Sequence, residues 1–300
     1  MHQSVVKIAV IGDVHDLWEL KDNDALKHLG VDLALFVGDY GNEAVDVVRR
    51  IAAVDLPKAA VMGNHDAYYS ASNKGQQKCP YDREKEDWVQ LQMDLLGEAH
   101  IGFGKREFPQ FALTVVGGRP FSWGGSKWRY RKFYRDRFDV KNFDESSDRI
   151  LAAADEAEHS TVIFLGHVGP YGLGNQREDI CGKDWGKRSA DYGDPDFAEA
   201  IALTQKSGKH VPLVAFGHMH HKLKNTDSRL RTRVVTGPEG TIYFNAANVP
   251  RVTATPTGRH RSFSVVTLRE HNVESINLVW LDAAFERISE EYIYRHPSLL

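Results

Sequence analysis

Five short apolar runs of this chain end in a glycine that is followed at once by an aspartate, an asparagine or a histidine. Short apolar runs that stop at glycine are typical of buried strands. Strand ends in α/β proteins are where polar groups gather around a ligand. The repetition therefore predicts a sheet protein whose functional site is assembled at strand ends. The runs lie at residues 7–11, 33–37, 59–62, 162–165 and 211–216.

The composition excludes several classes of protein. With 42% hydrophobic and 26% charged residues in a chain of 300, it is that of an ordinary soluble globular protein. The net charge of −3 offers no global field for nucleic acid or an anionic membrane. Cys79 and Cys181 lie far apart and lack CxxC spacing, which argues against a disulfide scaffold and against a cysteine zinc site. No apolar run approaches the roughly 20 residues of a membrane helix, and no leader pattern precedes the first strand. We expect a cytoplasmic protein without membrane contact.

Strand and helix patterns alternate in the first half of the chain, and strand patterns dominate the last quarter. This order favours sheets packed together with helices outside. No repeat or linker divides the chain, so a single domain over 1–300 is expected. Asn42 is expected to cap a helix that carries Glu43 in its first turn. Helices are expected near 22–29, 83–96, 146–158, 195–206 and in the tail 284–300, and further strands near 111–116, 234–236, 241–245, 263–268 and 276–280.

The segment 121–143 interleaves aromatic with basic residues. An amphipathic element that covers the protein, with its aliphatic stems packed and its charged heads in water, is the favoured interpretation. Binding of single-stranded nucleic acid by stacking and charge is a second. A third is that the segment rims the active site and attracts anionic substrates.

The polar residues at the five strand ends form a candidate metal site. They offer carboxylates, imidazoles and one amide but no thiolate, a mixture that suits Mn, Fe, Zn, Ni or Co better than Mg or Ca. Seven ligands exceed the needs of one tetrahedral ion but suit two ions that share a bridge, and such a pair is the usual device for cleaving phosphate esters. The candidates are Asp13, His15, Asp39, Asn64, His167, His218 and His220.

The order Asp-x-His, Gly-Asp, Gly-Asn-His-Asp, Gly-His and Gly-His-x-His resembles the calcineurin-like metallophosphoesterase superfamily. Each motif is weak alone, but all five occur in order over residues 13–220, each after an expected strand. The resemblance implies an α/β fold of the α+β type, a four-layer αββα sandwich with two central mixed sheets flanked by helices, and a site at the strand ends. In that arrangement 121–143 is an insertion and 284–300 a helical tail.

The resemblance also implies roles for individual residues. Asp13, His15 and His220 would hold one divalent ion, and Asn64, His167 and His218 the other, with Asp39 as the bridge. A hydroxide on the metals would attack phosphorus. His65 would not be a ligand but would face the substrate, as general acid or as a stabiliser of phosphoryl charge.

Two departures from the protein Ser/Thr phosphatases of the superfamily argue against that activity. Their Gly-Asp-x-x-Asp-Arg-Gly motif lacks a counterpart at 38–44, where Asn42 stands at the second aspartate, and their third motif ends in Glu where this chain has Asp66. Asn42 can accept a hydrogen bond from His65 but brings no charge. Arg119, on a glycine-flanked turn, is expected to replace the missing phosphate-binding arginine, with a surface loop cation as the alternative.

The leading prediction is a phosphoric ester hydrolase with two transition-metal ions, manganese first, acting on a small phosphomonoester or phosphodiester. A cyclic-nucleotide phosphodiesterase and a non-catalytic metal-bearing scaffold are the alternatives. A nuclease that uses 121–143 is a weaker one, since nucleic acid is not the expected partner. The residues leave the physiological substrate and the oligomeric state open.

Overall fold

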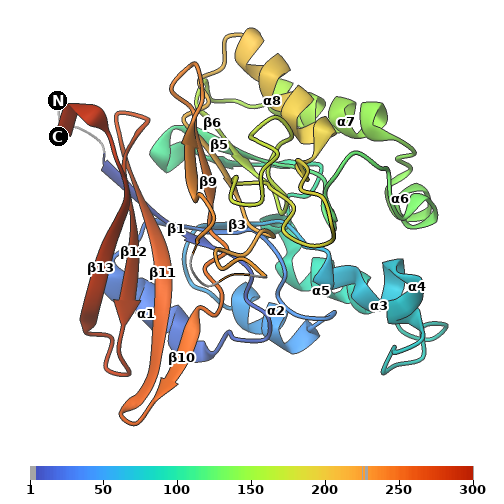
Figure 1. Ribbon diagram of the computed structural model, residues 1–300, viewed down its shortest axis with the longest axis horizontal. Coiled ribbons are helices and arrows are strands. Elements are labelled where there is room, and N and C mark those ends of the chain that lie inside the picture. Colours follow the sequence, from blue (N-terminus) through green and yellow to red (C-terminus); the bar gives the residue numbers. More distant parts are fainter. Residues whose placement is uncertain (1–4, 225, 227–228, 300) are drawn as a thin grey trace.

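The computed structural model describes residues 5–224, 226 and 229–299, in which two mixed β-sheets lie face to face between two layers of helices (Figure 1). The first sheet has the order β13-β12-β11-β1-β2-β3, and β10 pairs with β11. Its strands are β1 (Val5–Ile11), β2 (Leu33–Phe36), β3 (Lys58–Ala60), β10 (Val252–Thr255), β11 (Gly258–Arg269), β12 (Asn272–Leu281) and β13 (Arg287–Arg295).

The second sheet has the order β4-β5-β6-β7-β9-β8. It consists of β4 (Lys105–Phe108), β5 (Leu113–Gly117), β6 (Val162–Leu165), β7 (Leu213–Phe216), β8 (Val234–Thr236) and β9 (Ile242–Asn245). The α-helices are α1 (Leu20–Leu29), α2 (Val45–Ala52), α3 (Tyr68–Ala71), α4 (Asn73–Gln76), α5 (Trp88–Leu96), α6 (Arg131–Phe138), α7 (Phe143–Asp155) and α8 (Pro195–Lys206).

Alternation along the strands explains the four layers. Side chains two apart on a strand point to the same face. Leu33 and Leu35 of β2 therefore enter the core between the sheets, whereas Ala34 and Phe36 pack against α1 and α2. On β6, Ile163 joins the central core, and Phe164 packs in the cluster that includes α7 and α8. Both faces of β2, β6 and β7 are buried, so these runs are wholly apolar. The expected αββα sandwich is confirmed.

The strands that carry the polar motifs run parallel within each sheet. β1 and β2 are parallel in the first sheet, and β6 and β7 are parallel in the second. Because the carboxyl ends of parallel strands meet at one edge, the residues that follow them come together in space. The motifs of both sheets therefore lie at a common edge of the sandwich.

The expected helical tail is wrong. Residues 287–295 form β13, which pairs antiparallel with β12, and only the short turn Pro297–Leu299 is helical. Ile293 and Tyr294 pack against the central core. Pairing with β12 and this burial stabilise the extended conformation of the tail. They outweigh the helical pattern of the sequence, because no neighbouring element would cover the apolar face of a helix there.

The expected start of the helix near residue 83 is also wrong. α5 begins at Trp88, after Asp87, whose side chain accepts a hydrogen bond from the N–H of Gln90 (2.9 Å) and so caps the helix. The preceding loop holds two short helices, α3 and α4. Strands β4 and β10 had no clear signal in the sequence.

Neither Asn42 nor Glu43 has the predicted helical role. The helix starts at Val45 after Ala44, and Glu43 takes a positive φ of 49°. Glu43 is fully buried and accepts hydrogen bonds from the N–H of Ser70 (2.7 Å) and from the hydroxyl of Tyr81. It therefore anchors the loop that leads to α5 instead of complementing a helix dipole.

The segment 121–143 packs against the helices that cover the first sheet. Phe121, Phe133 and Phe138 pack in or against the cluster that contains α2 and α5. The hydroxyl of Tyr134 donates to the carbonyl of Pro120 (2.8 Å). The aromatic side chains of α6 thus act as packing groups, with the basic heads of its exposed face in water.

Candidate metal centre

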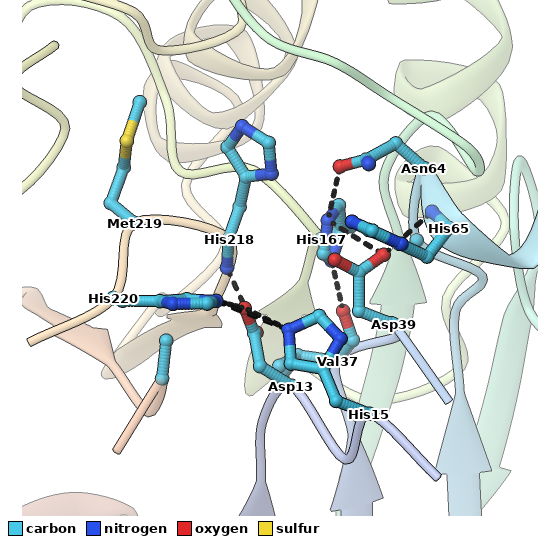
Figure 2. Close-up of polar contacts among 12 residues, drawn as sticks. Asp13, His15, Val37, Asp39, Asn64, His65, His167, His218, Met219 and His220 are labelled. Carbon is cyan, nitrogen blue, oxygen red and sulfur yellow. Dashed lines mark hydrogen bonds and ion pairs between the residues drawn. The ribbon is translucent and has the colours of Figure 1, made fainter. Parts of the chain in front are cut away.

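The residues at the five strand ends converge on one cluster, and all seven expected ligands belong to it (Figure 2). Asp13, His15 and His220 form one group, and Asp39, His167 and His218 form another. The amide oxygen of Asn64 joins the second group, 3.1 Å from Nε2 of His167.

Glycine before the motifs is required by close packing. A Cβ atom on Gly63 would lie 2.2 Å from Oδ1 of Asp39, and one on Gly217 would lie 2.3 Å from Oδ1 of Asp13. Any side chain at these positions would displace the carboxylates. At these two positions the glycine lets the backbone of one loop approach the carboxylate of another.

The loops also hold non-glycine residues in the left-handed region of φ. The φ angles are 43° at Asp13, 44° at His15, 55° at Asp39 and 68° at His218. Aspartate and histidine tolerate this region better than most residues, but it remains uncommon. Four such residues in one cluster indicate backbone strain that the surrounding contacts maintain, as is typical of functional sites.

The first group is built around Asp13, whose side chain is buried. Its Oδ1 accepts a hydrogen bond from the N–H of His218 (2.9 Å), which ties the first strand end to the last. Nε2 of His220 lies 3.1 Å from Oδ2, and Nε2 of His15 lies 3.9 Å from it. The two Nε2 atoms are 3.1 Å apart. Three donor atoms from the β1 and β7 loops therefore point at one position.

The second group is built around Asp39 and His167. Oδ1 of Asp39 accepts a hydrogen bond from the N–H of His65 (2.8 Å) and lies 3.4 Å from Nε2 of His167. Nδ1 of His167 lies 2.8 Å from the carbonyl of Val37, so it carries the proton and donates. This bond turns the unprotonated Nε2 toward Asn64 and Asp39, which is how proteins orient a metal-binding imidazole.

The protonation states suit metal ligands. Burial lowers the pKa of His218 to about 3 and also lowers the pKa of His15. Burial alone would raise the pKa of Asp13, but the neighbouring imidazoles, His220 foremost, bring it below its usual range. Neutral imidazoles and an ionised carboxylate are the forms that bind a cation. His220 departs from this pattern, because burial alone would lower its pKa but the hydrogen bond and the charge of Asp13 outweigh burial and raise it.

The donor set fits divalent transition-metal ions. Oδ2 of Asp13 is buried and has no hydrogen-bond partner of good geometry among the described residues, although it faces His15 and His220. A buried carboxylate oxygen without a partner is costly unless a cation neutralises it. Nitrogen and oxygen donors without sulfur fit the borderline ions that the motifs predict.

His65 stands beside the second group. Its Nδ1 lies 2.7 Å from the amide oxygen of Asn42, so Nδ1 donates and the neutral side chain of Asn42 orients the ring, as expected from the sequence. The ring lies 5.1 Å from that of His15 and 6.0 Å from the stacked ring of Tyr68. Nε2 remains for a proton or, since His65 also groups with His15 and Asp39, for an ion.

Asp66 is a residue whose importance the sequence motif did not explain. It is fully buried, and its carboxylate accepts hydrogen bonds from the N–H groups of Gly63 (2.6 Å), Tyr40 (2.8 Å) and Asp39 (3.0 Å). It therefore fastens the loop after β2 to the loop after β3. Burial, together with the charge of Asp39, raises the pKa of Asp66, although the three N–H groups favour its ionised form.

Arg231 is a second residue that the sequence did not single out. Its buried guanidinium donates to the carbonyls of His220 (3.0 Å) and Gly182 (2.6 Å). It therefore joins the loop that carries His218 and His220 to the loop over residues 169–194. No motif spacing could reveal it, because its partners are backbone carbonyls from remote parts of the chain.

The expectation that Arg119 binds substrate phosphate is wrong. Arg119 is buried and forms ion pairs with Asp194 (2.7 Å) and Asp196 (2.8 Å). Its guanidinium also lies over the rings of Trp128 (4.9 Å) and Phe143 (5.3 Å). The charge is thus neutralised inside the protein, where it anchors the start of segment 121–143 and does not line the pocket of the metal cluster.

Comparison with known proteins points to one family. A family model described as calcineurin-like phosphoesterase matches residues 6–222. The matched region holds all seven clustered residues and His65, and the part that follows supplies β8 to β13. No curated protein matches the chain. Among the helices that the structure describes, none has the length and apolar character to span a membrane.

Solved structures resemble the chain at low identity. The structure of TT1561 of Thermus thermophilus is 13% identical, with a TM-score of 0.49, and the match covers 97% of this chain and 100% of that chain. A dimetal phosphatase from Danio rerio is 13% identical, with a TM-score of 0.47 and coverage of 97% and 99%. A purple acid phosphatase from yellow lupin is 14% identical, with a TM-score of 0.46 and coverage of 97% and 54%. These likenesses concern the fold alone.

Proposed function

Because the chain belongs to the calcineurin-like phosphoesterase family, a family of metal-dependent phosphoesterases, we propose that it hydrolyses a small phosphomonoester or phosphodiester with two divalent ions. Asp13, His15 and His220 hold one ion in this proposal. The other is held by His167, His218 and Asn64, and Asp39 lies between them. The observation that carries the proposal is the pairing of two residue groups, each with a buried carboxylate and two imidazoles, at one edge of the two sheets.

The ions, when bound, supply a water nucleophile of lowered pKa and neutralise charge on the phosphoryl oxygens. The protein residues do the rest. Val37 and Asn64 keep Nε2 of His167 pointed inward. Asp66 holds the loops that carry Asp39 and Asn64 in register. The pre-set geometry lets the charges act without reorganisation at the moment of reaction.

His65 is proposed to protonate the leaving oxygen or to stabilise phosphoryl charge. Asn42 holds its Nδ1–H, so the ring cannot turn away, and Nε2 is the atom that moves the proton. A positioned imidazole of this kind contributes about 10²–10⁴-fold to a rate. Since Asn42 carries no charge, the ring is oriented without the electrostatic support that a carboxylate would give.

The clustered residues also help to decide between an enzyme and a non-catalytic metal-bearing scaffold. A protein that keeps the fold but not the chemistry has no reason to maintain strained φ angles at four site residues and a buried carboxylate oxygen without a hydrogen bond of good geometry. The present cluster retains these costs together with His65. This supports catalysis over a passive role.

A grid of metals and substrates tests the proposal. Protein stripped with a chelator should lose activity, and Mn should restore it, with Fe, Zn, Ni and Co as the comparison ions. The substrates are an aryl phosphomonoester, an aryl phosphodiester and cyclic nucleotides, which separate monoesterase, diesterase and cyclic-nucleotide phosphodiesterase activities. Hydrolysis that continues at the same rate after mass spectrometry verifies metal removal would overturn the proposal.

A further inference from the structure

The metal cluster forms only one wall of its pocket. The pocket has a volume of about 410 Å³, which is within the range of small-molecule sites. Its opposite wall comes from three segments outside the motifs: 121–143, the loop 169–194 and the loop after β7. This wall, which we call the outer wall, consists of Trp123, Trp185, Tyr192, Arg129, Lys222 and Lys224.

The aromatic part of the outer wall forms a corner. The rings of Trp185 and Tyr192 lie 4.8 Å apart at an interplanar angle of 78°, so the edge of one ring meets the face of the other. Trp123 adds a third partly exposed ring to the same pocket. A planar group that enters this corner finds a ring face on which to stack, which aromatic side chains offer to any nucleobase.

Tyr192 is held in place before any ligand arrives. The hydroxyl of Tyr192 accepts a hydrogen bond from Arg129 (2.9 Å), and the carbonyl of Tyr192 accepts one from the N–H of Gly125 (2.8 Å). A Cβ atom on Gly124 would lie 2.2 Å from that carbonyl, so the glycine is needed for the two loops to meet. Such preorganisation reduces the entropy cost of binding.

The cations of the outer wall are not neutralised. Within the described part of the chain, Arg129, Lys222 and Lys224 have no carboxylate partner within 4.0 Å, whereas Asp184 pairs with Arg231 (3.4 Å). Three unpaired positive charges beside the metal cluster exceed what one scissile phosphate needs, because the ions already neutralise that group. They favour a substrate with a second anionic group.

We propose that the outer wall is a subsite for the leaving group and that the leaving group is a nucleoside carrying a further phosphate. The base stacks in the corner of Trp185 and Tyr192, with Trp123 nearby, and the further phosphate meets Lys222, Lys224 and Arg129. This assignment names the substrate class of the hydrolase proposed above and rests on that proposal for the reaction, although not for the binding.

A small nucleotide fits better than a nucleic acid. Binding of a long phosphate backbone needs a continuous track of unpaired cations. Three of the four cations of α6 are paired, because Lys132 pairs with Asp136 (2.6 Å), Arg135 also pairs with Asp136 (3.1 Å), and Arg137 pairs with Asp87 (2.6 Å). Among the described residues the helix leaves Arg131 without a carboxylate partner, and one cation does not make a continuous track.

Calorimetry on the full-length His65→Asn variant, which is expected to keep both ions and to lose about 10²–10⁴-fold in turnover, tests the binding. The ligands are ribose 5-phosphate, adenosine 5′-monophosphate and adenosine 3′,5′-bisphosphate. The expected gain from the base is about 10-fold to 100-fold in affinity, with a further gain of about 2-fold to 5-fold for the second phosphate. Equal affinity for ribose 5-phosphate and adenosine 5′-monophosphate would overturn the subsite.

Variants of the outer wall test which residues provide the gain in affinity from the base and from the second phosphate. Adding Trp185→Leu should reduce the preference for adenosine 5′-monophosphate over ribose 5-phosphate by about 10-fold or more. The matched control is Tyr171→Leu, an exposed aromatic of the same loop that lies outside this pocket. Lys222→Ala should remove the gain from the second phosphate, with exposed Lys187→Ala as its control. Equal effects of a variant and its control would overturn the assignment.

Two further outcomes separate the proposals. Affinity for oligodeoxyadenylate that rises with length and falls steeply with salt, and that exceeds the affinity for the bisphosphate, would overturn the nucleotide in favour of single-stranded nucleic acid. Selective nucleotide binding without metal-dependent hydrolysis of any phosphoester by the wild-type protein would support the subsite and overturn the hydrolase.

Discussion

Replacing Asp66 with asparagine tests how the two central loops are held. The carboxylate of Asp66 accepts three backbone hydrogen bonds, from the N–H groups of Gly63 (2.6 Å), Tyr40 (2.8 Å) and Asp39 (3.0 Å). These donors belong to the two loops that carry Asp39 and Asn64. In asparagine one oxygen becomes an NH₂ group, which cannot accept. If the NH₂ group takes the place of Oδ1, the hydrogen bond from the N–H of Tyr40 is lost. If it takes the place of Oδ2, the hydrogen bonds from Gly63 and Asp39 are both lost, so the first orientation costs less.

The magnitude follows from that geometry. A buried N–H left without a partner costs about 1–3 kcal/mol, and the site offers no solvent to replace it because Asp66 is fully buried. We therefore expect the free energy of unfolding to fall by about 1–3 kcal/mol for the single bond. Because the freed loops carry Asp39 and Asn64, metal affinity should fall by about 10-fold to 100-fold, as is typical when a residue that orients ligands is lost.

Urea denaturation with metal titration measures both effects. The control is Asp87→Ala, which removes the cap of α5 and should cost about 1 kcal/mol of stability, with no change in metal affinity. If Asp66→Asn lost stability, as the Asp87→Ala control does, but kept wild-type metal affinity, the idea that Asp66 positions the metal centre would be refuted. Unchanged stability would refute the hydrogen-bond argument itself.

Three other predictions follow from the site and the core. Asp39→Asn should lower metal content below two ions per chain and turnover by more than about 100-fold; two ions with near wild-type turnover would refute the bridge. His65→Asn should lower turnover by about 10²–10⁴-fold while mass spectrometry still finds two ions, and loss of an ion would instead identify His65 as a ligand. Burial lowers the pKa of His100 to about 4 from 6.5, so its folded state resists protonation. Stability should be full above pH 6.5 and fall as the pH drops toward 4, by at most about 1.4 kcal/mol per pH unit. His100→Gln should flatten that part of the denaturation profile, and an identical slope in the variant would refute the assignment.

Local sequence identified the clustered residues and their order along the chain. An apolar run of a buried strand followed by glycine and a polar residue is a short-range pattern, and it marked all seven clustered residues. The resemblance to the family added His65 and its hydrogen bond to Asn42. The order of strand and helix patterns favoured sheets packed together with helices outside, and the resemblance to the family specified the four layers, which the structure confirms. Such features depend on neighbours a few positions away.

Tertiary structure decided the rest, since it depends on contacts between segments far apart in the chain. Arg119 became a buried ion pair with Asp194, 75 positions away, and the tail became β13 because β12 offered an edge to pair with. Asp66 and Arg231 hold the site through backbone groups that no motif records. The outer wall likewise unites three loops, and its rings and cations line one pocket with the clustered residues only because folding brings these loops together.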